Sequence, residues 1–286
     1  MKRILVTGCD GMLGSAVEQV FSDYKLIKTD IEELDVRGIS MHSDKIDYIL
    51  HLAALTDLEY CENYPRHAYF TNTIGTMNMV ELAKELDIPI VYISTAGVFG
   101  KEEGKLYNNK QFRYYDENSK PSPINMYGLS KYYGELAVQA YPKHYIFRIS
   151  WAFGGGSRDR KFVMKVIKQI RQGFKEIYAI NDVSGSPSYT KDVAKVIKDF
   201  IDTKKPYGLY HIPSGVATRY DVAKEIVRLL GAPTKICAVK DSYFLDYTAT
   251  RPKCEVLLSV KDVRVRHWRK SIEEYINELV ADKSIS

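Results

Sequence analysis

The sequence predicts an α/β fold, in which a doubly wound parallel sheet is followed by a smaller mixed α/β lobe. Strand-like and helix-like segments alternate through residues 1–150, a pattern typical of a parallel sheet with helices on both faces. The first strand, predicted at residues 2–7, is continuously apolar at Ile4, Leu5 and Val6. Strands that alternate with helices and lack a polar face are expected at the centre of such a sheet.

The composition is that of a globular protein with a sizeable core, at 286 residues with 45% hydrophobic and 27% charged residues. No apolar run reaches the roughly 18 residues of a membrane span. The apolar run near the N-terminus stops at Thr7, too early for a signal peptide. The four cysteines form no C-x-x-C pair, and no cluster has metal-ligand spacing. We therefore expect a cytoplasmic protein with reduced thiols and no metal, and the modest net charge of +5 indicates neither a nucleic-acid nor a membrane partner.

A glycine-rich turn follows the first strand and precedes a helix predicted at residues 15–21. Gly8 permits the tight turn, Gly11 lets a pyrophosphate approach the backbone, and Gly14 lets the helix pack closely on the strand. Free N–H groups at the start of the helix would bind the phosphates. Such triplets are frequent in ordinary turns, but this position at the first strand–helix junction indicates a Rossmann-type dinucleotide site.

A second strand, predicted at residues 25–28, is followed by Asp30, which lies 22 positions after Gly8. A carboxylate there would accept hydrogen bonds from an adenosine ribose and disfavour a 2′-phosphate, which favours NAD(H) over NADP(H). The alternative is an ordinary loop aspartate. We place Asp35 and Val36 near the adenine.

Two further strands are predicted at residues 46–54 and 88–94, separated by a helix at residues 68–86 that carries Asn72. The first ends in small residues that leave room for a cofactor, although plain core packing explains them equally well. The second runs into Ser94 and Thr95, whose hydroxyl groups suit hydrogen bonding to a ketone. The polar stretch that follows, residues 101–125, is interpreted as a surface excursion.

Tyr127 and Lys131 stand four residues apart on a helix predicted at residues 127–140, so they share one face. A tyrosine normally titrates near pH 10, and a nearby ammonium favours its phenolate. We therefore expect the Tyr127 pKa to lie closer to neutrality, which would make it a usable proton donor. With 22 tyrosines in the chain, the spacing alone also arises by chance.

The second half mixes short strands with helices, and we divide the chain into a dinucleotide-binding domain at residues 1–150 and a substrate-binding lobe at residues 151–286. Residues 188–206 are interpreted as a possible return to the first domain. His51 and His211 are expected to be packed histidines, and Trp268 a core anchor in the basic stretch 264–270. The expected strands are residues 144–150 and 207–212, and the expected helices are residues 162–173, 192–202, 220–230 and 271–280.

These features resemble the extended short-chain dehydrogenase/reductase family, and the second half is closest to its dTDP-4-dehydrorhamnose reductases. The glycine turn and the Tyr127/Lys131 pair carry the wider resemblance. The branch is indicated by the stretches 147–151, 180–187 and 208–211 and by Arg251-Pro252. The resemblance implies NAD(P)H-dependent reduction of the C4 ketone of a nucleotide-linked 6-deoxy sugar, as in dTDP-L-rhamnose biosynthesis.

The resemblance also implies roles for individual residues. Tyr127 would protonate the forming alkoxide, Lys131 would lower its pKa and bind the nicotinamide ribose, and Thr95 would bind the sugar oxygen and tune Tyr127. Substrate contacts are implied at Thr95, Ala96, Trp151 and Arg251. Cofactor contacts are expected at Gly8, Gly11, Met12, Leu13, Gly14, Asp30, Asp35, Val36, Ala53, Ala54, Leu55, Thr56, Asn72, Tyr127 and Lys131.

Three departures from the reductase pattern leave the sugar and the base open. Ala96-Gly97 replaces Asp-Tyr, Glu59 stands for an Asp, and Lys253-Cys254-Glu255 replaces Gly-Asn-Ser. A sugar-nucleotide 4-epimerase or dehydratase on the same scaffold is one alternative. It would keep its cofactor bound and need no added reductant. A non-catalytic regulatory subunit is another, because fold does not dictate function, although Tyr127, Lys131 and Thr95 argue against it. The nucleotide-sugar substrate is the expected partner, and a homodimer stays open.

Overall fold

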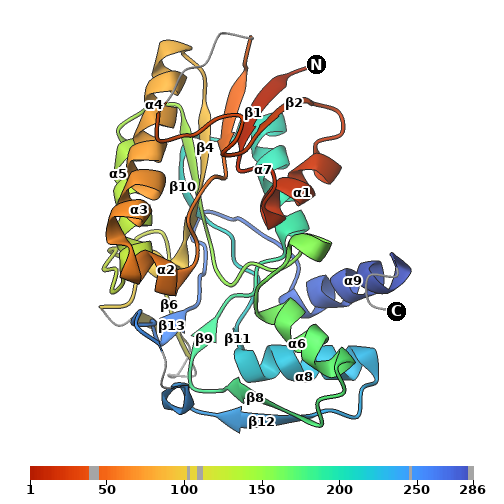
Figure 1. Ribbon diagram of the computed structural model, residues 1–286. Helices are drawn as coiled ribbons and strands as arrows, with labels where there is room; N and C mark the ends of the chain where they lie inside the picture. The colour runs from red at the N-terminus through yellow and green to blue at the C-terminus, as the bar shows by residue number, and fades with distance from the viewer. Residues whose placement is uncertain (39–44, 102–103, 108–111, 245–246, 283–286) are drawn as a thin grey trace.

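The computed structural model describes residues 1–38, 45–101, 104–107, 112–244 and 247–282. Its main layer is a six-stranded sheet in the order β10-β7-β4-β3-β1-β2, in which every pair is parallel (Figure 1). The order reverses between β1 and β3, and ligands of such sheets bind in the crevice at that switch point. The strands are β1 (Arg3–Thr7), β2 (Lys25–Thr29), β3 (Tyr48–His51), β4 (Ile90–Thr95), β7 (His144–Ile149) and β10 (Gly208–His211).

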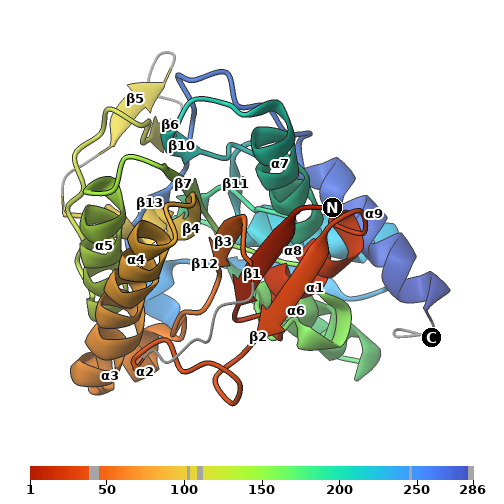
Figure 2. The ribbon, with the colours of Figure 1, turned by 90° about the horizontal axis from the view of Figure 1, so that it is seen from above.

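Helices cover both faces of this sheet, which confirms the predicted α/β fold (Figure 2). On one face α1 (Met12–Val20) packs against α7 (Thr190–Thr203). On the other, α4 (Gly75–Glu85) packs against α5 (Met126–Gln139). The apolar side of each helix points into the core, because each presents residues such as Val17 or Met79 that are fully buried. Helix α7 packs on this layer and β10 is its edge strand, and we propose that residues 188–206 belong with the first lobe.

The second lobe lies below the sheet layer in Figure 1 and has its own apolar core. Its helices are α6 (Phe162–Arg171), α8 (Arg219–Leu230) and α9 (Trp268–Ala281), beside the parallel pair β8 (Glu176–Ile180) and β12 (Lys235–Val239). Trp268 is fully buried and donates its indole N–H to the Val216 carbonyl at 3.1 Å, as expected of a core anchor.

A small three-stranded sheet lies between these two parts in Figure 1, in the order β11-β9-β13. It consists of β11 (Ala217–Thr218), β9 (Ser184–Gly185) and β13 (Cys254–Glu255). Cys254 and Glu255 pair in parallel with Ser184 and Gly185. Residues far apart in sequence therefore meet beside the carboxyl ends of the large sheet.

Several segments differ from the sequence-based expectation, among them the following three. The predicted helix 68–86 is divided into α3 (Pro65–Tyr69), the π-helix η1 (Phe70–Ile74) and α4. Helix α2 (Leu58–Asn63) was not expected. The surface excursion contains the antiparallel pair β5 (Lys105–Tyr107) and β6 (Phe112–Tyr114), and parts of it, residues 102–103 and 108–111, lie outside the described residues.

Short 3₁₀ helices complete the elements: η2 (Ala96–Val98), η4 (Gly156–Arg158) and η5 (Asp241–Tyr243). Within the described parts of the chain, every helix is too short or too polar to span a bilayer. Cys9, Cys61, Cys237 and Cys254 are free thiols.

Candidate active site

The turn after β1 forms a cradle in which side chains would not fit. Gly8 has a φ of 68°, and a Cβ on it would lie 2.7 Å from the Ala53 backbone in the loop after β3. A Cβ on Gly14 would lie 2.1 Å from the Cys9 carbonyl oxygen. Gly11 caps α1 without a side-chain hydrogen bond, and the first turn of α1 carries no acidic residue. Backbone N–H groups at the start of α1 are therefore left to an anionic ligand, which fits a dinucleotide pyrophosphate.

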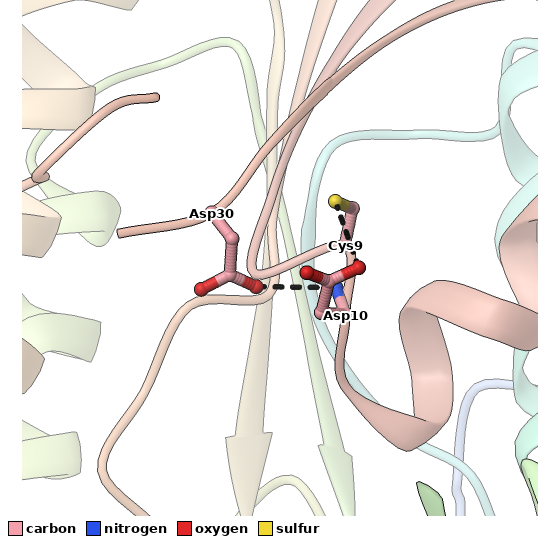
Figure 3. A group of neighbouring side chains, drawn as sticks. All are labelled: Cys9, Asp10 and Asp30. Atoms are coloured by element: carbon pink, nitrogen blue, oxygen red, sulfur yellow. Dashed lines mark hydrogen bonds between the residues drawn. The ribbon is translucent and has the colours of Figure 1, made fainter. Parts of the chain in front are cut away.

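Asp30 follows β2 directly and lies beside this cradle (Figure 3). Its carboxylate accepts hydrogen bonds from the backbone N–H of Asp10 at 3.1 Å and of Ile31 at 2.8 Å. The side chain remains partly exposed. The structure thus brings Asp30 to the glycine turn, where the sequence pattern places a ribose-binding carboxylate.

Cys9, Asp10 and Asp30 form a compact group whose potential ligand atoms all lie within 4.8 Å of one another (Figure 3). Burial, followed by the charges of Asp10 and Asp30, raises the pKa of the Cys9 thiol. Metal ligation needs a thiolate. The raised pKa and the backbone hydrogen bond to Asp30 favour a structural role for the group at the turn.

Asp35 and Val36 occupy different environments. The Arg37 guanidinium, through its hydrogen bonds, lowers the pKa of the Asp35 carboxyl at the surface. Val36 is buried under α4, where a Cβ on Gly75 would lie 2.6 Å from its side chain. Its carbonyl accepts a hydrogen bond from Asn78 at 2.8 Å. Asp35 therefore remains accessible for a ligand contact, whereas the Val36 side chain packs in the core.

The loop after β3 is fixed by Asn72 from the π-helix. The Asn72 side chain accepts from the Leu55 N–H at 2.8 Å and donates to the Leu55 carbonyl at 2.9 Å. It also donates to the Ser130 hydroxyl at 3.0 Å. Because this amide is fully buried and hydrogen-bonded, Asn72 positions Leu55 against α5 and presents no free group to a cofactor. Ala53 and Ala54 are partly exposed beside this fixed loop, as is Leu55, and Thr56 is exposed.

Thr95 and Tyr127 meet where β4 and α5 approach each other. Asn125 caps α5 by accepting the Gly128 N–H at 2.8 Å, and a Cβ on Gly128 would lie 2.0 Å from the Gly97 carbonyl oxygen. This close approach brings the two side chains together, since a Cβ on Gly97 would lie 3.3 Å from the Thr95 hydroxyl oxygen and 3.5 Å from the Tyr127 ring. The same hydroxyl accepts the Gly97 N–H at 3.0 Å. The two residues predicted to act on one substrate oxygen are therefore adjacent.

Burial dominates the titration of the Tyr127/Lys131 pair. It raises the pKa of Tyr127 to about 12, against a smaller lowering by the hydrogen bond with Thr95. It lowers the pKa of Lys131 to about 7, although Glu135 acts in the opposite direction. The Lys131 amine lies 4.0 Å from the centroid of the Tyr92 ring. The expectation that an ammonium brings Tyr127 towards neutrality is therefore wrong for the cofactor-free protein, because dense surroundings disfavour both charged forms.

Replacing Lys131 by methionine should stabilise the cofactor-free protein at pH 7 and lose about half of that effect by pH 9. Lys131 is 3% exposed, and its pKa is about 7 in the folded state against an ordinary 10.5. Between these values the unfolded chain binds the proton and the folded chain does not, so wild-type stability rises with pH. The advantage of the variant should shrink by roughly 2–3 kcal/mol between pH 7 and 9. Urea unfolding at both pH values measures it, and a pH-independent difference would contradict the low pKa.

Trp151 lies two residues after the end of β7 and has a left-handed backbone with a φ of 41°. Its indole N–H donates to a Glu255 carboxylate oxygen at 2.6 Å, and the Arg219 guanidinium carbon lies 3.9 Å from its ring centroid. Arg251 is held by Glu59 at 2.8 Å and stacks on Tyr247. These two predicted substrate residues therefore remain partly exposed in a polar setting.

Ala96, also expected to contact substrate, is fully buried in an apolar cluster with Phe99, Tyr115 and Leu257. Its side chain does not reach an open surface, since it begins η2 and points into this core. Of the four predicted substrate residues, Thr95, Trp151 and Arg251 carry polar groups, and those of Trp151 and Arg251 are held by Glu255 and Glu59.

Four polar residues of this region were not identified from the sequence as parts of the site. They are Ser130, Glu135, Arg219 and Arg148, and Arg148 pairs with Glu135. Glu135 lies four residues after Lys131, so helical spacing alone placed it on the same face of α5. The others are joined by contacts between distant segments. No local pattern marks them.

Comparison with known proteins places this geometry in a family. The family model described as "RmlD substrate binding domain" matches residues 1–281. The spore coat polysaccharide biosynthesis protein SpsK of Bacillus subtilis is 31% identical, over 97% of this chain and 98% of its own length. The dTDP-4-dehydrorhamnose reductase of Mycolicibacterium smegmatis is 26% identical, over 98% of this chain and 86% of its own.

Solved structures agree with the fold. A dTDP-4-dehydrorhamnose reductase from Clostridium acetobutylicum superposes with a TM-score of 0.88 at 31% identity, covering 97% of this chain and 99% of that one. A dTDP-4-dehydrorhamnose reductase from Bacillus anthracis, solved in complex with NADP, gives 0.87 at 28% identity with the same coverage. Together with the sheet order and the glycine cradle, these matches show that the chain belongs to the RmlD substrate-binding domain family, within the extended short-chain dehydrogenases/reductases.

Proposed function

We propose that this protein is an NAD(P)H-dependent reductase of the C4 ketone of a nucleotide-linked 6-deoxy sugar, as in dTDP-L-rhamnose biosynthesis. The observation that carries the proposal is the adjacent pair Thr95 and Tyr127, one helical turn from Lys131. The reductases named among its relatives and the NADP bound to the Bacillus anthracis protein support the reaction class.

The residues of the β1/β3 crevice fit a dinucleotide. Gly8, Gly11 and Gly14 leave room for its phosphates, and Asp30 offers a carboxylate to its adenosine ribose. Lys131 would face the nicotinamide ribose. When bound, the reduced nicotinamide supplies the hydride that reaches the ketone carbon.

Tyr127 supplies the proton in this proposal. Its phenol stays protonated at neutral pH, because its pKa lies near 12 without ligands. As the ketone becomes an alkoxide, the phenol gives its proton to that oxygen, and Thr95 donates a hydrogen bond to the phenolate left behind. A protonated Lys131 would stabilise the same phenolate. The product is an alcohol, and Tyr127 regains its proton from solvent.

The proposal is tested by following oxidation of NADH and NADPH against a panel of 4-keto-6-deoxy sugar nucleotides, with product stereochemistry read by NMR. We expect stoichiometric oxidation of the cofactor and a single C4 alcohol. Purified protein that already carries its cofactor and converts substrate without added reductant would instead favour an epimerase or dehydratase. Absence of turnover together with retained ligand binding would favour a regulatory subunit.

Replacing Asp30 by alanine should lower the preference for NADH over NADPH about tenfold. The carboxylate lies beside the glycine cradle, where it would accept from ribose hydroxyls and repel a 2′-phosphate. A hydrogen bond to a charged group contributes about 1.5–3 kcal/mol. The ratio of kcat/KM for the two cofactors measures the effect. Glu32→Ala removes an exposed carboxylate of the same loop and should leave the ratio unchanged. An unchanged ratio in Asp30→Ala would exclude the ribose contact.

A further inference from the structure

Trp151 is held in an unfavourable backbone conformation at the edge of the candidate site. A non-glycine residue in the left-handed region is strained and persists only where its surroundings determine it. Two contacts do so here: the hydrogen bond to Glu255 at 2.6 Å and the Arg219 guanidinium 3.9 Å from the indole centroid. A Cβ on Gly185 would lie 2.4 Å from the indole, so the backbone of β9 also packs against it. Such arrangements cluster at ligand-binding sites.

Glu255 reaches Trp151 from the small three-stranded sheet. Its strand β13 pairs with β9, which fixes the backbone of Glu255 opposite Gly185. Among the described residues, the Trp151 indole is the one side chain that donates a hydrogen bond to this carboxylate. Burial raises the Glu255 pKa, and the Glu255 charge in turn contributes to the raised pKa of Tyr127. The carboxylate therefore belongs to a partly exposed residue close to the candidate proton donor, and it has one oxygen without a donor from the described chain.

The two arginines of this region do not neutralise Glu255 by direct pairing. Arg251 is engaged by Glu59 at 2.8 Å and by the Ala249 carbonyl at 3.0 Å. Arg219 stacks on Trp151 and on Phe162, and within the described residues no carboxylate lies within 4.0 Å of its guanidinium nitrogens. Burial lowers its pKa to about 10, so it remains a cation at neutral pH. The Glu255 carboxylate and the Arg219 guanidinium therefore both contact the Trp151 indole without forming an ion pair with each other.

The free oxygen of the Glu255 carboxylate is open to a donor from a ligand, because Glu255 is only partly buried. Sugar rings carry several hydroxyl donors, and sites that bind a hydroxyl reject analogues lacking it far more strongly than apolar pockets do. A hydrogen bond to a charged acceptor is stronger than one between neutral groups. A substrate hydroxyl bound to this oxygen would therefore be distinguished from an analogue that lacks it.

We propose that Glu255 is a specificity-determining residue of the sugar site: its second carboxylate oxygen accepts a hydrogen bond from a ring hydroxyl of the nucleotide sugar, while the first holds Trp151. The inference rests on the proposed function, since it places the sugar beside Tyr127 and Trp151. It also gives a role to the departure at residues 253–255, and it supplies a substrate-side carboxylate from β13 where Ala96-Gly97 supplies none.

The test removes Glu255 and the sugar hydroxyl separately and together. It measures binding affinity, so that it does not depend on turnover. Isothermal titration calorimetry compares a 4-hydroxy 6-deoxy sugar nucleotide with its 2-deoxy and 3-deoxy analogues. In the wild-type protein, one analogue should bind roughly 10- to 100-fold more weakly, the range of a hydrogen bond to a charged group. In Glu255→Ala the same two ligands should bind alike. A wild-type discrimination that persists in Glu255→Ala would overturn the proposal, and so would a wild-type protein that does not distinguish the ligands.

Two controls separate this role from a structural one. Trp151→Phe removes the indole donor and leaves the carboxylate, so it should weaken binding and still discriminate between hydroxyl and deoxy ligands. Loss of discrimination in Trp151→Phe as well would assign the effect to the position of Trp151 and overturn the proposal. Glu273→Gln, exposed on α9, should match the wild-type protein in every measurement. Thermal unfolding confirms that each variant folds, and Glu255→Leu serves if Glu255→Ala does not. Discrimination in binding without ketone reduction would leave the role of Glu255 standing and reject the reductase.

Discussion

Replacing Tyr127 by phenylalanine is expected to lower kcat by about two to four orders of magnitude while leaving cofactor affinity nearly unchanged. The phenol is the group that the structure places against Thr95, and a positioned proton donor typically contributes 10²- to 10⁴-fold. Phenylalanine keeps the ring, so the close packing of α5 on η2 is preserved. Stopped-flow or steady-state NADH oxidation measures kcat, and quenching of protein fluorescence by the cofactor measures its affinity.

Tyr133→Phe is the matched control, because Tyr133 lies on the same helix with 43% of its surface exposed. It should retain wild-type turnover. Near-normal kcat in Tyr127→Phe would remove Tyr127 as the acid. A loss of cofactor binding equal to the loss of turnover would instead indicate that Tyr127 only shapes the pocket.

The high pKa of Tyr127 indicates that bound ligands take part in activating this residue. With a pKa of about 12 the phenol is a poor acid, so catalysis requires that bound ligands change its surroundings. Lys131 is suited to that change, because its pKa of about 7 lies close to physiological pH. A small stabilisation of its ammonium by ligand hydroxyls would make it fully charged beside the phenolate. The pair is therefore expected to act when the cofactor is bound rather than in the free protein.

The sequence predicted the parts of this site that depend on short-range pattern. The glycine turn, the strands that flank it and the Tyr127/Lys131 helix each follow from residues close together in the chain, and each is present. It missed β9 and β13, because two-residue strands carry no periodicity and form only through pairing with distant segments. The Tyr127 pKa was also mispredicted, since helical spacing shows the neighbouring charge but not how deeply both groups are buried.

The ion pair between Glu135 and Arg148 could not be predicted either, because no local sequence pattern reveals it. Glu135 lies on α5 and Arg148 on β7, and their side chains are 0% and 2% exposed. The guanidinium donates to both carboxylate oxygens, at 2.8 Å and 2.6 Å. It also donates to His211 Nε2 at 3.3 Å, while His211 Nδ1 faces the Leu258 carbonyl at 3.1 Å. Burial lowers the His211 pKa to about 4, so this histidine is a neutral acceptor within the network.

Arg148→Met should therefore destabilise the protein by about 3–5 kcal/mol, the cost of leaving a buried carboxylate without its partner. Glu135→Leu alone should be similarly harmful, because it leaves a buried guanidinium. The double variant should recover most of the loss, since apolar residues of similar size often replace a buried ion pair without penalty. Urea unfolding of the four proteins at pH 7 gives the coupling energy between the two positions.

The single and double variants also decide what this ion pair does for the active site. Glu135 is the group that acts to raise the Lys131 pKa against burial, so its removal should lower that pKa further. If the double variant is as stable as the wild type but turns over slowly at pH 7, the pair serves chiefly to keep Lys131 charged. If turnover instead recovers in parallel with stability, the Glu135/Arg148 pair serves only to join β7 to α5. Additive losses in the double variant would contradict a direct interaction between the two side chains.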